Sequence, residues 1–69
     1  MDFYKQLSEI FEEDVISETN LKDLEAYDSL SILSIIAMAD KSYNVTLTAS
    51  DVRSVDTASQ LKDMIEKKA

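Results

Sequence analysis

The sequence predicts a single all-α domain, with three longer helices, one short helix and a long loop between the first two. Apolar residues recur at spacings of three and four along three stretches, as they do on one face of an α-helix. Aspartate and threonine, which commonly cap helix starts, stand just ahead of the predicted helices. A chain of 69 residues has the size of one small domain, so we treat residues 1–69 as a single unit.

The first helix is predicted over about residues 3–13, directly after Asp2. Its apolar residues would form one stripe. They are Phe3, Leu7, Ile10 and Phe11. From Asp14 to Tyr27 the pattern loosens, which predicts a long loop anchored by a few apolar side chains. The expected anchors are Val15, Ile16, Leu21 and Leu24.

The second helix is predicted from about Ser29 to Tyr43. Asp28 is a good N-cap, because its carboxylate can accept a hydrogen bond from an unpaired amide of the first turn. Apolar residues lie on more than one face of this stretch, so we expect it to be the central helix. Three apolar residues of this helix are expected to pack against the first and last helices, or else to be exposed and offer a hydrophobic contact to a partner. They are Ile32, Ile35 and Met38.

Two more helices are predicted in the last third of the chain. Thr48 followed by Asp51 has the spacing of a capping box, which predicts a short helix near residues 49–54. We expect Asp56 to cap the last helix. Its apolar residues recur at helical spacing, and they are Ala58, Leu61, Met64 and Ile65.

The net charge of −7 is concentrated in one part of the chain. Residues 9–28 hold eight acids and one base, Lys22, so the remaining residues sum to zero. Such an acidic field repels nucleic acid and favours basic protein surfaces. We interpret the acids at residues 12–14 as a solvated charge run rather than a cation site.

The chain contains neither histidine nor cysteine. It therefore lacks an unperturbed general base at neutral pH, a thiolate nucleophile and the soft ligands of zinc. This composition argues against an enzyme. Ser29 is expected to be accessible at a helix start, but nothing obvious in the chain would activate its hydroxyl, so another enzyme would have to act on it.

Residues 21–30, Leu-Lys-Asp-Leu-Glu-Ala-Tyr-Asp-Ser-Leu, resemble the attachment motif of acyl carrier proteins. The predicted order of elements, with the serine near the midpoint, resembles that family as well. The resemblance implies a four-helix bundle of the acyl carrier type that carries 4'-phosphopantetheine on Ser29. The thiol of this arm would hold acyl groups as thioesters. Its phosphodiester would lie beside the first amides of the second helix, a place that tolerates negative charge.

The resemblance also implies which residues surround the cargo and the partner enzymes. An acyl chain would be sheltered between the helices. The residues expected to line that space are Leu30, Leu33, Ile36, Ala37, Val52, Ala58, Leu61 and Ile65. The motif and docking residues are Asp28, Leu30, Ser31, Ser34, Met38 and Asp40.

The chain departs from the family pattern in two places. Ala26 and Tyr27 stand where most acyl carriers have glycine, so the loop geometry is expected to differ. The family usually has acids along the exposed face of the second helix, whereas this chain has Ser31, Ser34 and Lys41 there and keeps only Asp40. We therefore expect docking to depend less on charge, with both serines as solvated surface residues.

The implied partners are a phosphopantetheinyl transferase and the acyl-transfer and condensing enzymes of a fatty-acid or polyketide-type pathway, or an acyl or aminoacyl ligase. Two alternatives stay open. One is an aminoacyl or D-alanyl carrier. The other is an unmodified acidic helical module that binds a basic partner through residues 9–28. We expect a cytoplasmic monomer that binds no nucleic acid and no metal and has no signal peptide or membrane-spanning segment.

Overall fold

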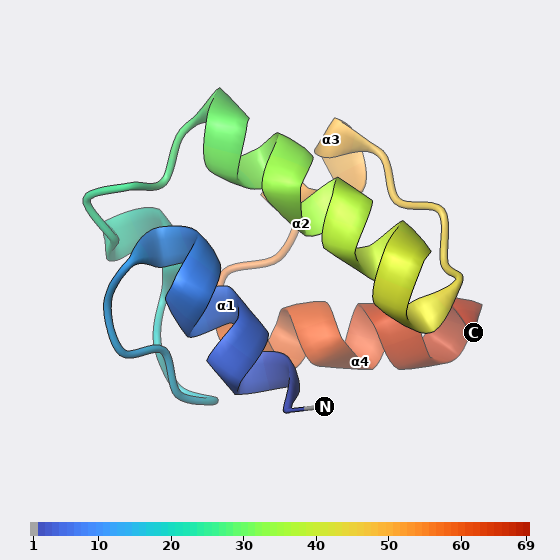
Figure 1. Ribbon diagram of the computed structural model, residues 1–69, viewed down its shortest axis with the longest axis horizontal. Helices are drawn as coiled ribbons and strands as arrows, with labels where there is room; N and C mark the ends of the chain where they lie inside the picture. Colours follow the sequence, from blue (N-terminus) through green and yellow to red (C-terminus); the bar gives the residue numbers. More distant parts are fainter. Residues whose placement is uncertain (1) are drawn as a thin grey trace.

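The computed structural model describes residues 2–69, and its helices enclose one apolar core (Figure 1). It contains α1 (Phe3–Phe11), the 3-10 helix η1 (Leu21–Asp23), α2 (Ser29–Tyr43), α3 (Ala49–Arg53) and α4 (Ala58–Lys68). No β-strand occurs within residues 2–69. The all-α prediction is therefore confirmed, together with the order of three longer helices and one short helix.

Helix α1 starts where the sequence predicts and ends two residues early. The backbone N–H of Tyr4 donates to Asp2 Oδ1 at 3.0 Å, so Asp2 is the N-cap. Glu12 takes a left-handed conformation with φ 57°, and this stops the helix at Phe11. The predicted stripe is buried except at Ile10, which is half-buried.

The loop between α1 and α2 is held by fewer anchors than predicted. Val15 and Leu21 are buried and Leu24 is half-buried, as expected. Ile16 was expected to be an anchor, but that prediction is wrong because its side chain is 57% exposed. The backbone N–H of Val15 donates to Ser8 Oγ at 2.9 Å and holds Val15 against the core, while the next residue turns to solvent.

Helix α2 has the predicted bounds and runs antiparallel to α1 (Figure 1). The Tyr43 hydroxyl at its end donates to Gln6 Oε1 at 2.9 Å, and the Tyr43 and Phe3 rings meet edge to face. One face of α2 packs into the core through Ile32, Ile35 and Ala39. The helix ends at Tyr43, because its C-cap Asn44 is left-handed like Glu12, with φ 56°.

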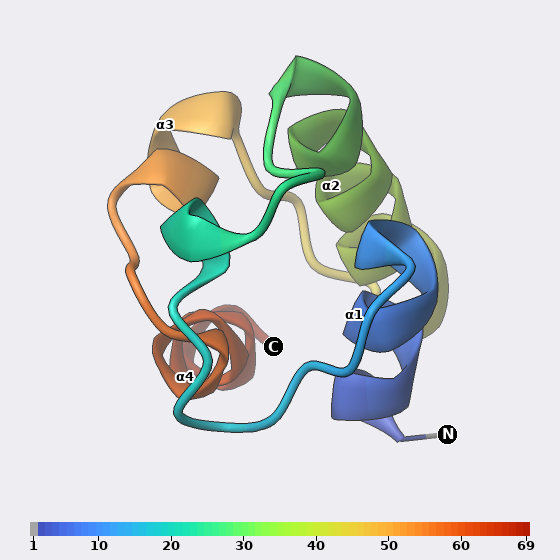
Figure 2. The same cartoon turned by 90° about the vertical axis from the view of Figure 1, so that its left-hand side faces the viewer.

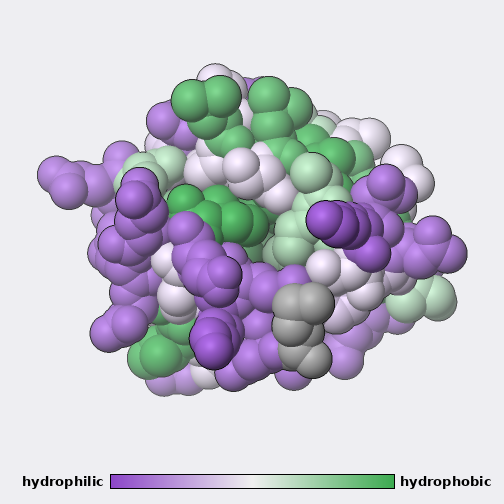
Figure 3. Space-filling view, viewed as in Figure 1, coloured by the Kyte–Doolittle hydropathy of each residue, from purple (hydrophilic) through white to green (hydrophobic). Residues whose placement is uncertain are grey.

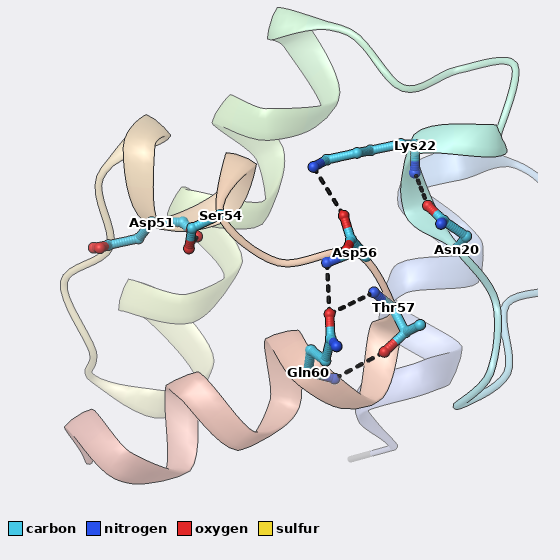
Figure 4. Close-up of polar contacts among 7 residues, drawn as sticks. All are labelled: Asn20, Lys22, Asp51, Ser54, Asp56, Thr57 and Gln60. Carbon is cyan, nitrogen blue, oxygen red and sulfur yellow. Dashed lines mark hydrogen bonds and ion pairs between the residues drawn. The ribbon is translucent and has the colours of Figure 1, made fainter.

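The starts of α3 and α4 are both closed by capping boxes. Thr48 and Asp51 form the box predicted for α3. The predicted cap of α4, Asp56, is wrong by one residue. Thr57 is the N-cap, because its Oγ1 accepts a hydrogen bond from Gln60 N and the Gln60 side chain accepts one from Thr57 N (Figure 4).

The loop before α2 lies against the start of α4 (Figure 2). Asn20 and Thr57 form an isolated antiparallel bridge, and Leu21 N donates to Asp56 O at 2.8 Å. Lys22 Nζ also pairs with Asp56 Oδ1 at 2.9 Å (Figure 4). The middle of this loop, residues 20–22, is thus tied to the segment that begins α4.

Candidate functional site

Ser29 is the first residue of α2 and is exposed, at the outer end of the molecule where α2 begins (Figure 1). Its side chain makes no hydrogen bond to another of residues 2–69. The expectation of an accessible hydroxyl at a helix start is confirmed. Position and exposure both leave the Ser29 oxygen open to a second protein.

Asp28 and Ser31 hold the start of α2 in a capping box. Ser31 N donates to Asp28 Oδ1 at 2.9 Å, and Asp28 N donates to Ser31 Oγ at 2.9 Å. The Ser31 hydroxyl also donates to Asp28 O at 2.9 Å. Ser31 is therefore only 5% exposed. Its prediction as a solvated docking residue is wrong, because its side chain is part of the cap.

The first two backbone amides of α2 have no hydrogen-bond acceptor within residues 2–69. Ser31 N and Ile32 N are bonded to Asp28. Ser29 N and Leu30 N have no acceptor among residues 2–69. Unpaired N–H groups at a helix start carry partial positive charge and favour an anion. A phosphate group esterified to Ser29 would lie beside them.

Tyr27 occupies the place where the family pattern has glycine, and it packs against the core. Its backbone N–H donates to Leu24 O at 3.1 Å, which closes a turn just before the cap. Its hydroxyl is buried and has no hydrogen-bond partner within residues 2–69. The hydrogen bond to Asp56, with smaller electrostatic contributions from Asp56 and Tyr27, raises the pKa of Lys22. Tyr27 and Lys22 thus anchor the segment that leads to Ser29.

The structure does not bring the eight predicted acyl-pocket residues together. Val52, Ala58, Leu61 and Ile65 are buried in the core, and Ile36 is half-buried beside it. The other three are exposed on the outer face of α2. They are Leu30 at 71%, Leu33 at 60% and Ala37. Their assignment to an internal space is wrong for this structure, because the helical turn places them opposite the buried Ile32 and Ile35.

The other residues predicted to take part in docking lie on the outer side of α2. Leu30, Ser34 and Asp40 are exposed, and Met38 is half-buried. Ser34 and Met38 line a hollow of about 450 Å³ between α1 and α2. Ile10, the α1 residue that departs from the buried stripe, lines the same hollow. Its half-burial was missed because the helical spacing alone placed it with the core residues.

Within residues 2–69, no cluster of three or more acidic, histidine or cysteine side chains could bind a metal ion. None of the helices described for these residues combines the length and the apolar content needed to cross a membrane. Comparison with protein-family models, with curated proteins and with solved structures finds no match to this chain.

Proposed function

We propose that this protein is a carrier that holds acyl groups as thioesters on a 4'-phosphopantetheine arm attached to Ser29. The observation that carries the proposal is the open start of α2, where an exposed serine and two unpaired amides lie together. The sequence of residues 21–30 supports the same assignment through its resemblance to the acyl carrier motif.

Loading would be carried out by a phosphopantetheinyl transferase with coenzyme A as the donor. The Ser29 oxygen forms a new ester bond to the phosphorus that bears the pantetheine. The pyrophosphate bond of coenzyme A breaks, and adenosine 3',5'-bisphosphate leaves. The serine proton passes to a base of the transferase, because the chain contains no histidine or cysteine to accept it. The chain itself positions the hydroxyl and offers the first-turn amides to the new phosphate.

Loaded protein would present the arm to acyl-transfer and condensing enzymes of a fatty-acid or polyketide-type pathway. An aminoacyl or D-alanyl carrier is the second candidate. The outer face of α2 favours it, because Asp40 is the only acid within Ser29–Tyr43. A dedicated ligase that loads such a carrier would not need an acidic helix.

The test is co-expression with a broad-specificity phosphopantetheinyl transferase, followed by intact-mass measurement. We expect one phosphopantetheine on the wild type and none on Ser29→Ala. Ser50→Ala is the control, because Ser50 is an exposed serine on α3 with no role in the proposed site and should leave loading unchanged. An unmodified wild type, or equal loading of Ser29→Ala, would contradict the carrier and favour the unmodified acidic module.

A further inference from the structure

Tyr27 carries the one buried side-chain polar atom that has no hydrogen-bond partner within residues 2–69. Other hydroxyls close to the core are paired. Tyr43 donates to Gln6 at 2.9 Å, and Ser31 donates to the Asp28 carbonyl at the same distance. A buried hydroxyl without a partner loses its hydrogen bonds to water and gains nothing in return. Phenylalanine would fill the same space without that loss, so the Tyr27 hydroxyl does not stabilise this folded state.

Tyr27 belongs to a short segment, residues 24–27, which we call the Tyr27 segment. On one side of it, residues 17–22 are bonded to the start of α4, and on the other side the capping box closes α2. The Tyr27 segment itself makes two backbone hydrogen bonds, at 3.2 and 3.1 Å, and each joins residues three positions apart. Within residues 2–69, none of its hydrogen bonds reaches α1, α2, α3 or α4. It runs along the edge of the molecule (Figure 1) and is held there by the packing of Leu24, Ala26 and Tyr27 on the core.

The backbone directs the side chains of Tyr27 and Ser29 to the same side. Asp28 between them is extended, with φ −154° and ψ −172°. An extended residue places the side chains before and after it on one face of the chain. The Tyr27 ring packs on the core, whereas the Ser29 side chain is exposed. A phosphate esterified to Ser29 would therefore start on the side toward which Tyr27 projects.

The other side chains next to Ser29 offer no free donor to such a phosphate. Asp28 is an acid, and the Ser31 hydroxyl already donates to the Asp28 carbonyl. Leu30 is 71% exposed but apolar, and Figure 3 shows apolar residues gathered over the first half of α2. The Tyr27 hydroxyl is therefore the one unengaged side-chain donor within two residues of Ser29.

The charged side chains of this region do not replace Tyr27 as a donor. Glu25 and Asp28 are acids and repel a phosphate. Lys22 is the one base among residues 9–28, and its ammonium group is paired with Asp56 Oδ1 at 2.9 Å. A neutral hydroxyl thus supplies the hydrogen bond that these charges do not.

We infer that Tyr27 is a positioning residue for the phosphopantetheine arm: once Ser29 is loaded, the Tyr27 segment swings outward and the Tyr27 hydroxyl donates a hydrogen bond to a phosphate oxygen. This inference rests on the carrier function proposed above. The phosphodiester is negatively charged, and hydrogen bonds to charged acceptors are stronger than those to neutral ones. Because this bond exists only in the loaded protein, loading itself favours the outward position of the segment. The cap of α2 and the bonds between residues 17–22 and α4 stay in place.

The first test is a stability cycle, in which each protein is melted before and after loading by the broad-specificity transferase and coenzyme A. In the unloaded protein, Tyr27→Phe should raise the melting temperature by about 3 °C, because it removes an unpaired buried hydroxyl. In the loaded protein, it should lower the melting temperature by about 3 °C relative to loaded wild type, because the bond to the phosphate is lost. The sign of the effect thus reverses on loading.

Tyr43→Phe is the matched control for the stability cycle. The Tyr43 hydroxyl is already paired with Gln6, and it lies at the other end of α2 from Ser29. Its removal should lower the melting temperature by about 3 °C in the loaded and in the unloaded protein alike, because the two sites are far apart.

The second test observes the phosphate directly by phosphorus NMR of the loaded proteins. Tyr27→Phe should shift the phosphodiester resonance, because one of its oxygens loses a hydrogen bond. Tyr43→Phe should leave the resonance at the wild-type position. Phenylalanine keeps the ring at position 27, so a role of Tyr27 in packing alone would not move the resonance.

A reversed sign for Tyr27→Phe together with a shifted phosphorus resonance would support the inference. Equal effects of Tyr27→Phe before and after loading, or an unmoved resonance, would overturn it while leaving the carrier function intact. A lower melting temperature of unloaded Tyr27→Phe would also overturn it, since the hydroxyl would then already be paired, for example by an ordered water. A wild type that is never loaded would overturn the carrier function and the inference together.

Discussion

The starts of α2 and α4 have the same local chemistry and opposite surroundings. Each has an oxygen-bearing N-cap and a capping box, formed by Asp28 with Ser31 and by Thr57 with Gln60. At α4, the loop before α2 also covers the first turn. Ala58 N donates to Thr19 O and Ser59 N to Ser17 O, both at 3.0 Å. At α2, no segment within residues 2–69 takes that place.

In both helices the capping residues determine where the helix begins. Contacts with the rest of the chain determine whether the first-turn amides are accessible. The same loop closes α4 with its carbonyl groups and then leads to the open start of α2 (Figure 2). One helix start therefore contributes to the tertiary structure. The other is firmly held by its own cap and remains available to a ligand or an enzyme.

The largest expected effect is on amide hydrogen exchange at the two starts. Ala58 N–H and Ser59 N–H should exchange only when the loop leaves α4, so their protection should approach the stability of the domain, about 3–5 kcal/mol. Ser29 N–H and Leu30 N–H should be at least about 100-fold less protected. NMR-detected exchange measures this difference. Equal protection would mean that the start of α2 is covered in solution.

The next largest expected effect is the loss of folding stability when a charged side chain replaces Ser31. Ser31→Lys should lower the free energy of unfolding by about 2–3 kcal/mol, because lysine offers no acceptor to Asp28 N and forces an ammonium group into a buried position at the positive end of the helix dipole. Ser34→Lys is the control at an exposed position of the same helix and should change stability by less than about 0.5 kcal/mol. Urea titrations of both variants measure the difference, and matching midpoints would place Ser31 at the surface.

A smaller effect should follow from removing the cap of α2. Asp28→Ala should cost about 1 kcal/mol of unfolding free energy, since Ser31 N loses its acceptor. Asp28→Asn keeps an oxygen acceptor and should cost less than half as much. If both variants lose the same stability, the charge of Asp28 on the helix dipole would matter more than the hydrogen bond.

The smallest effects are those of pH on two charged side chains, Lys22 and Asp51. The pKa of Lys22 is raised above 10.5 in the folded state by the Asp56 contact. Its contribution to stability is therefore complete below that pH and is lost as pH rises through the folded pKa. The pKa of Asp51 is lowered below 3.8, first by the Thr48 N–H, so its contribution is lost as pH falls below that value.

Melting temperatures of the wild type and Lys22→Gln across the alkaline range measure the first of these effects. The two proteins should differ slightly near neutral pH and converge above pH 10.5. A difference that persists at higher pH would show that Lys22 acts through its aliphatic stem instead.

Local signals in the sequence predicted much of the fold and part of the site. The bounds of α2 and the caps Asp28 and Thr48 follow from residues only three positions apart. The same spacing could have prevented two wrong predictions, Asp56 as the cap of α4 and Ser31 as a solvated residue. Thr57 and Gln60 have the spacing of a capping box, and the Asp28 to Ser31 spacing marks Ser31 as a capping residue.

Other features depend on contacts between distant segments. Apolar residues surround much of α2, so helical periodicity cannot decide whether Leu33 or Ile35 faces the core. Helices α1 and α3 both contact α2. They bury Ile35 and leave Leu33 exposed to solvent. The bond from Ala58 to Thr19 likewise joins residues far apart in the chain, and no local pattern encodes it.

The left-handed ends of α1 and α2 have a consequence for how this chain can be improved. Glu12 and Asn44 both adopt positive φ, in a sequence without glycine. A side chain with a Cβ atom pays about 1–2 kcal/mol in that conformation, with asparagine better suited than glutamate. Glu12→Gly would relieve this steric strain without changing Ser29 or its capping box. The chain can therefore be stabilised at the end of α1 without altering the proposed attachment site.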